Sequence, residues 1–292
     1  MSMDPTLWSF LSQWSWRLDV LFVLIALGTT FTIGWWRLRQ RGAWVARPWR
    51  LAVYLAGLGS VALALLSPID SFAPSLFLMH MVQHELIIMV AAPLLLLADP
   101  LPIILWSLPR NFRLGVRRLL ARGAMVRQIL RSATWMPVAG GLFVVNLWAW
   151  HIPAAYEAAL RNHLLHHMEH LSFFGTAVLF WWPIINPAPR LHGQVAYGFR
   201  ILYILAATFQ TVALGFAIAV TERVLYSHYA AAPRLWGISP LDDQAYGGAI
   251  MSEAGMMFLI PLLVLVNRWL NEEERRTRLR ESMTLRIRKA AE

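Results

Sequence analysis

Cysteine is absent from this chain, which excludes disulfide bonds, thiolate metal sites and thiol catalysis. Charged residues are scarce as well, at 14% of the 292 residues, whereas 58% are hydrophobic. The mean hydropathy of +0.51 lies far above that of a soluble domain of average composition. The composition therefore indicates one multi-helix membrane domain, without room for a second large soluble domain.

Acidic residues are outnumbered by basic ones, 16 against 26, and the net charge is +10. Such an excess can indicate a nucleic-acid-binding protein. Here, however, the arginines concentrate in segments that flank apolar runs, which is the pattern of membrane topology. We therefore expect membrane lipids among the partners of the chain, and no nucleic acid.

Seven apolar runs are long enough to cross a hydrocarbon layer, which at about 30 Å needs roughly 20 helical residues. They lie near residues 17–36, 51–68, 75–98, 135–152, 163–185, 198–220 and 247–266. The expected fold is an all-α membrane protein, a bundle of about seven transmembrane helices. Residues 1–266 would form the polytopic membrane domain, followed by a basic tail over residues 267–292.

The basic residues also predict how the bundle is oriented. The segments that carry 22 of the 26 Lys and Arg residues are 37–50, 99–134, 186–200 and 267–292. They alternate with sparsely charged segments along the expected spans. Because basic loops stay on the cytoplasmic side, the N-terminus is predicted to be outside and the C-terminal tail to be cytoplasmic.

Histidines gather in two of the expected spans. His80 and His84 lie four apart in the third span, and the fifth span begins with His163, His166, His167 and His170. Side chains four apart share one face of a helix, so each span presents an array of imidazoles. In the predicted topology eight of the nine histidines lie on the extracytoplasmic side, and only His192 lies inside. Ionisable residues within a membrane segment indicate a functional site.

The two arrays together offer the ligands of a metal site. His166 and His167 point about 100° apart on a helix, and the spacing does not choose between them. Asp243 precedes the seventh span at the same level, and Glu169 could bind an ion or orient a neighbouring imidazole. Imidazole with carboxylate suits Cu(II) or zinc, and nearby methionines would suit Cu(I). The candidate metal ligands are His80, His84, His166, His167, His170 and Asp243.

Several motifs of the chain are similar to those of one known family. In order they are His80-Met81-Val82-Gln83-His84 with the apolar run to Ala92-Pro93, Trp150-His151-Ile152-Pro153, Glu169-His170, and Pro240-Leu241-Asp242-Asp243-Gln244 with Gly247-Gly248. Over roughly residues 50–265 the chain resembles the CtaG family of cytochrome c oxidase assembly factors, of the caa-type oxidase branch. The single-span, cysteine-containing copper chaperone of the same name is unrelated.

The resemblance implies a multi-pass protein of the bacterial plasma (inner) membrane that helps to mature a copper-containing oxidase, with the oxidase subunits as partners. We therefore expect an assembly factor, rather than an enzyme, that binds copper at an extracytoplasmic histidine cluster and delivers it. In this hypothesis the ion is held by His80, His84, His167 and His170, with Asp243 or a methionine completing the site.

Two alternatives stay open at this point. In the first, three imidazoles hold zinc and a carboxylate such as Asp243 or Glu253 acts on the bound water, which would make the chain an intramembrane hydrolase. In the second, histidines of the third and fifth spans are axial ligands of haem.

Overall fold

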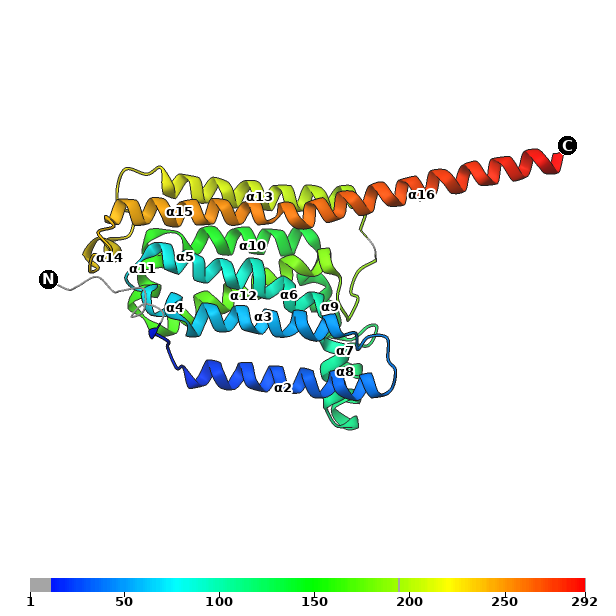
Figure 1. Cartoon of the computed structure of the whole chain (residues 1–292), viewed down its shortest axis with the longest axis horizontal. Coiled ribbons are helices and arrows are strands. Elements are labelled where there is room, and N and C mark those ends of the chain that lie inside the picture. The colour runs from blue at the N-terminus through cyan, green and yellow to red at the C-terminus, as the bar shows by residue number, and fades with distance from the viewer. Residues whose placement is uncertain (1–11, 194, 292) are drawn as a thin grey trace.

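Every regular element in the described part of the chain, residues 12–193 and 195–291 of a computed structural model, is a helix (Figure 1). The prediction of an all-helical fold is therefore confirmed. Residues 1–11 of the expected membrane domain and residue 292 of the expected tail lie outside the described residues.

Five helical segments are long and apolar enough to cross a membrane, namely Leu18–Gln40, Pro48–Phe72, Phe77–Leu97, Tyr197–Ala219 and Pro240–Thr284. A sixth span results if α10 (Met136–Trp150) and α11 (Pro153–Arg161), which meet at 74°, cross the membrane together. α12 (His163–Ile185) has the bounds expected of the fifth span but is not among these segments. Its first turns carry four histidines and Glu169, which lower its hydropathy. By length and composition the structure supports five or six spans, where the sequence predicted about seven.

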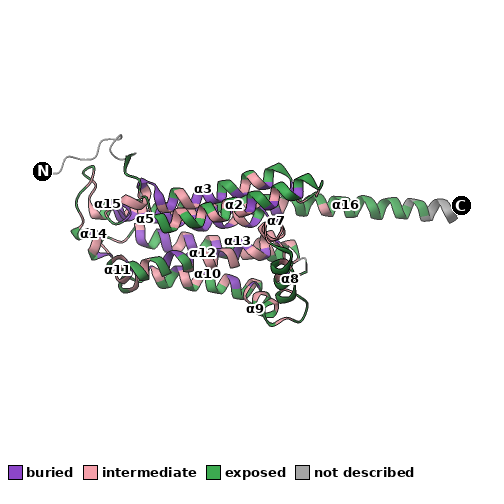
Figure 2. Cartoon of the chain, turned by 90° about the horizontal axis from the view of Figure 1, so that it is seen from below, coloured by how far each residue is buried: buried purple, intermediate pink, exposed green. Residues whose placement is uncertain are grey.

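The helices pack in two groups around one central segment (Figure 1). α2 (Leu18–Gln40) packs on α3 (Pro48–Leu66) and α7 (Pro100–Ser107), with the Phe31 and Tyr54 rings stacked 3.8 Å apart. α13 (Tyr197–Ala219) packs on α15 (Pro240–Met257), and α10 packs on α12. Between these two groups of helices runs the central segment, which consists of α5 (Phe77–Glu85), η1 (Leu86–Ala91) and α6 (Ala92–Leu97). Figure 2 shows buried residues lining the inside of this arrangement.

The central segment contains a widened, π-helical stretch, η1, which begins two residues after His84. Pro93 follows it and has no N–H to donate, so one upstream carbonyl loses its partner in the helix. The Ile88 carbonyl, five residues earlier, instead accepts a hydrogen bond from Trp181 Nε1 of α12 at 3.1 Å. The local register change after His84 is therefore fixed to α12, the helix that carries the second histidine array.

The two ends of the bundle differ in composition. One end, called here the histidine end, is formed by α11, α14 (Ser227–Ala231) and the first turns of α5, α12 and α15 (Figure 1). The opposite, arginine end carries α8 (Arg110–Leu119) and α9 (Met125–Ala133), neither of which has a buried residue. α4 (Pro68–Phe72) links α3 to the histidine end. α16 (Leu259–Ala291) extends from the arginine end as one helix, so no break marks the expected boundary between residues 266 and 267.

Small residues allow α13 and α15 to approach closely. A Cβ atom added to Gly248 would lie 2.6 Å from the Ala219 nitrogen and the Gly215 carbonyl oxygen. Both neighbours are backbone atoms of α13, which cannot move aside as a flexible side chain can. Membrane helices use such small residues to pack, because lipid supplies no hydrophobic force to hold them together.

We expect Gly248→Ala to destabilise the protein by about 1–3 kcal/mol, because the added methyl group forces α13 and α15 apart. Gly59→Ala on α3 is the matched control, since nothing lies within 4 Å of a Cβ placed there. That control should gain up to about 1 kcal/mol from helix propensity. Thermal unfolding of the purified proteins in detergent measures both, and equal midpoints would contradict the close packing.

Candidate metal centre

The two helices that carry the histidine arrays begin at fixed positions. The Asn162 side chain accepts hydrogen bonds from Leu164 N at 2.9 Å and Leu165 N at 3.2 Å, which caps α12 one residue before His163. The first turn of α5 has no such local cap. Its backbone donors are taken up by Asp243 of α15 instead: Phe77 N donates to Oδ2 at 2.7 Å and Leu78 N to Oδ1 at 3.0 Å. Each array is thus anchored at its helix start.

Asp243, predicted as a ligand, therefore uses both carboxylate oxygens to hold the first turn of α5. It belongs to neither of the groups of possible ligands that the described residues form. The neighbouring Gln244 is equally occupied, since its Oε1 accepts from Leu225 N and its Nε2 faces the carbonyls of Ile218, Thr221 and Arg223. The Asp243-Gln244 pair holds helix and loop ends together, and its direct contact with an ion stays a prediction.

The first group that could hold a metal ion consists of His80, His84 and His170, all buried. One ring nitrogen from each lies within 4.8 Å of the others. The ring centroids of His80 and His84 are 4.4 Å apart, and those of His84 and His170 are 5.2 Å apart. The arrays of α5 and α12 thus meet at the histidine end.

A second group shares His80 with the first and adds His166 and Glu169, again with ligand atoms within 4.8 Å of one another. His166 is half-buried, whereas Glu169 is fully buried. One carboxylate oxygen of Glu169 lies 3.8 Å from Nε2 of His84, so this carboxylate of the second group also lies close to the first group.

Polar atoms of these residues have no hydrogen-bond partner among the described residues. The six buried ones are His80 Nε2, His84 Nδ1 and Nε2, His170 Nε2, and both carboxylate oxygens of Glu169. Leaving a buried polar group unpaired costs roughly 1–3 kcal/mol, and more for a charged one. Imidazole nitrogens and carboxylate oxygens that are buried together without partners are the donor set of a cation site, and imidazole with carboxylate fits copper or zinc.

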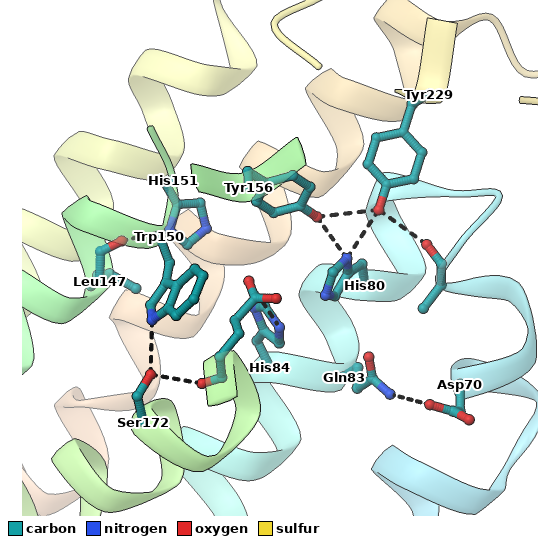
Figure 3. A network of polar contacts seen from close by, with 12 residues as sticks. Asp70, His80, Gln83, His84, Leu147, Trp150, His151, Tyr156, Ser172 and Tyr229 are labelled. Carbon is teal, nitrogen blue, oxygen red and sulfur yellow. Dashed lines mark hydrogen bonds and ion pairs between the residues drawn. The ribbon is translucent and has the colours of Figure 1, made fainter. Parts of the chain in front are cut away.

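Two further histidine contacts fix how imidazoles face the cluster. Nδ1 of His80 lies 2.7 Å from the Tyr156 hydroxyl and 3.0 Å from the Tyr229 hydroxyl, all three groups being buried (Figure 3). Burial raises the pKa of Tyr229 well above its usual range, so this hydroxyl stays protonated. His151 donates from Nδ1 to the Leu147 carbonyl at 2.7 Å, and its Nε2 is buried and unpaired among the described residues.

His167 and His163, by contrast, are exposed. Nε2 of His167 accepts a hydrogen bond at 2.9 Å from the guanidinium of Arg17, which can only donate. A cavity of about 520 Å³ is lined by these exposed histidines together with Asp19, Asp70, His166 and His80. It connects the surface of the histidine end to the cluster. Of the two histidines that the sequence left open, His166 therefore joins the cluster, and His167 lines its approach.

Sequence reasoning missed the two tyrosines and left Glu169 out of the candidate ligands. Tyr156 and Tyr229 belong to the short helices α11 and α14, 73 residues apart, and no spacing rule links them to His80. Glu169, which the sequence indicated only as a residue that could bind an ion or orient an imidazole, belongs to the second group. Glu253, considered as the base of a zinc hydrolase, is exposed and belongs to neither group.

Comparison with known proteins gives a family for most of the chain. Residues 29–272 match the family described as cytochrome c oxidase caa3 assembly factor. Uncharacterized proteins of Mycobacterium bovis (Mb0105) and Mycobacterium tuberculosis (MT0111) are each 26% identical over 274 residues, and one of Mycobacterium leprae (ML1998) is 24% identical over 271 residues. Each alignment covers 89% of this chain but only 40% of the relative, so the chain spans less than half the length of these proteins. No solved structure matches the chain.

We expect Asp243→Asn to destabilise the metal-free protein by about 1.5–3 kcal/mol, because the amide nitrogen would replace one of the two acceptors of the α5 backbone. Asp242→Asn is the control: Asp242 is exposed and accepts a hydrogen bond from Ser239, so its loss should matter by less than about 1 kcal/mol. Thermal unfolding in the presence of a metal chelator measures both. Equal stability of Asp243→Asn and the unsubstituted protein would show that the carboxylate does not anchor α5.

Proposed function

Since the chain belongs to the cytochrome c oxidase caa3 assembly factor family, we propose that it binds copper at the histidine cluster and delivers it to a copper-containing cytochrome c oxidase. Copper is here the cargo and not a resident cofactor. The observation that carries the proposal is the convergence of His80, His84 and His170 through buried nitrogen atoms that have no partner among the described residues.

The donor chemistry supports copper as the ion. With no thiolate in the chain, imidazole and carboxylate are the strong ligands at hand. Sites of this kind bind Cu(II) more tightly than zinc or the other common divalent first-row ions. The Glu169 carboxylate, buried beside His84, supplies negative charge that offsets the charge of the ion. Three imidazoles leave a coordination position free, through which a cargo ion can be exchanged.

The two overlapping groups suggest how the ion moves. An ion that enters the cavity meets His166, the half-buried member of the second group, and then His80, which both groups share. Exchange of His166 and Glu169 for His84 and His170 would carry it inward while His80 keeps hold of it. Delivery to the oxidase reverses this order.

The same proposal includes an orientation in the membrane. We place α12 across the membrane as a further span, the N-terminus outside and α8, α9 and α16 on the cytoplasmic side of a bacterial plasma membrane. This orientation puts the arginine end in the cytoplasm and the histidine end on the extracytoplasmic side. The alternation of basic segments supports it, as does the position of α8 and α9 at the end opposite the cluster (Figure 1).

The packing of the imidazoles argues against haem as the ligand. Between the two helices, the ring centroids of His84 and His170 are 5.2 Å apart and those of His80 and His166 are 5.3 Å apart. Rings in such contact leave no slot for a porphyrin between two axial ligands.

A zinc hydrolase requires a water held on the ion together with a base, and Glu169 is a buried carboxylate that could serve as this base.

Copper binding by the purified, metal-stripped protein tests the proposal. We expect the unsubstituted protein to retain about one equivalent of copper after dialysis, and His80→Gln with His84→Gln to retain almost none. Copper at 100 times its Kd should stabilise only the unsubstituted protein, by about 2.7 kcal/mol. His192→Gln is the matched control, since His192 pairs with Thr134 at the arginine end and should bind copper normally.

Elemental analysis and an absorption spectrum of the same samples separate the alternatives. Zinc retained in preference to copper, with hydrolysis of a lipid or amide, would favour the hydrolase, and a Soret band would favour haem. Cells that carry the double variant should assemble an oxidase with reduced copper content. Full copper retention by the double variant would overturn the assignment of the site.

A further inference from the structure

A chain of hydroxyl groups runs from His80 to a backbone carbonyl. His80 Nδ1 lies 2.7 Å from the Tyr156 hydroxyl, which lies 3.2 Å from the Tyr229 hydroxyl. The Tyr229 hydroxyl also lies 3.0 Å from His80 Nδ1, and it donates to the Ala73 carbonyl at 3.1 Å (Figure 3). Four polar contacts thus join one imidazole nitrogen, two hydroxyls and one carbonyl oxygen, all buried.

The carbonyl at the end of the chain sets the direction of the hydrogen bond from Tyr229. The Ala73 carbonyl can only accept, so the Tyr229 hydroxyl donates its single proton there. Towards Tyr156, the Tyr229 hydroxyl can then only accept. Tyr156 has one proton, which it can donate either to Tyr229 at 3.2 Å or to Nδ1 of His80 at 2.7 Å. When that proton goes to Tyr229, Nδ1 of His80 carries a proton of its own. If Nδ1 is unprotonated, only the two hydroxyl protons of the tyrosines are available for the four contacts. If Nδ1 is protonated, three protons are available for them.

We propose that Tyr229 and Tyr156 are positioning residues that hold neutral His80 in the tautomer with a proton on Nδ1, so that its Nε2 presents a lone pair to the cluster. Nε2 is the His80 atom that is buried without a partner among the described residues. The inference rests on the proposed function in one respect, namely that this nitrogen binds the metal ion. Metal-binding histidines commonly donate their other ring N–H to such an acceptor.

His151 shows the same arrangement with a simpler acceptor. Its Nδ1 donates to the Leu147 carbonyl, and its buried Nε2 is left as a lone pair. His84 differs, since both of its ring nitrogens lack a partner in the described part of the chain. Within the first group, His80 therefore has a fixed tautomer, whereas His84 can adapt to the ion.

The two tyrosines are not equivalent in this scheme. Without the Tyr229 hydroxyl, Tyr156 loses its acceptor and turns its proton toward Nδ1 of His80, 2.7 Å away. His80 then changes tautomer, and Nε2 becomes protonated. Without the Tyr156 hydroxyl, Nδ1 still donates to Tyr229 at 3.0 Å, and Tyr229 still donates to Ala73. The tautomer should therefore survive Tyr156→Phe and be lost in Tyr229→Phe.

The experiment compares Tyr229→Phe, Tyr156→Phe and Tyr226→Phe in the full-length protein. Tyr226 is the matched control, because it is equally buried and stacks in the same aromatic group, yet its hydroxyl donates to the His151 carbonyl and not to His80. Nitrogen-15 NMR of metal-free, histidine-labelled protein reads the tautomer, with the His80 signals assigned by their loss in His80→Gln. Copper titration of the same proteins reads the affinity.

We expect Tyr229→Phe to exchange the two His80 nitrogen shifts and to weaken copper binding by about 10- to 100-fold. Tyr156→Phe should weaken it by less than about 10-fold and Tyr226→Phe by less than about twofold, both with the His80 tautomer unchanged. Equal effects of the first two variants, or an unchanged tautomer in Tyr229→Phe, would overturn the inference. If the unsubstituted protein binds no copper, the proposed function fails, while the nitrogen shifts still decide the role of the tyrosines.

Discussion

The structure depends on one constraint, which is that each polar atom buried away from bulk water must find a partner within the protein or in something that the protein binds. At the histidine end most of this pairing is complete. Asp243 takes up the backbone donors that open α5, and Gln244 accepts from one amide and shares its two N–H groups among three carbonyls at the end of α13 and in the loop after it. In contrast to these paired groups, six atoms of His80, His84, Glu169 and His170 are buried without a hydrogen-bond partner among the described residues.

The same constraint explains why the cluster can be both buried and ordered. Its side chains stand on helix starts that are held from outside their own helices, α5 by α15 and the π-helical stretch after it by Trp181. Ligands on rigid, anchored helices need little reorganisation to receive an ion. The cavity that joins exposed His163 and His167 to buried His80 supplies the access that such rigidity would otherwise deny.

The sequence predicted the parts of the site that follow from local geometry. Residues four apart face one way on a helix, so the spacing alone pairs His80 with His84, and His166 with His170. The fifth expected span, 163–185, coincides with α12. At Asp243 the structure adds a contact that the sequence did not indicate, because a carboxylate beside histidines has the same appearance in sequence whether or not it also caps a helix 166 residues away. The two tyrosines carried no signal, since only tertiary packing brings α11 and α14 to His80.

The sequence by itself determined the class of the protein, because its composition is too apolar and too poor in charge for a water-soluble fold. It also determined which imidazoles share a helix face, because helical periodicity is a local property. Only the tertiary structure decided that His166 rather than His167 joins the cluster, that Asp243 anchors α5, and that a hydroxyl chain ends on the Ala73 carbonyl. These outcomes depend on the rotation of each helix against its neighbours and on which donors burial leaves unpaired. Both are set by packing between residues far apart in the chain.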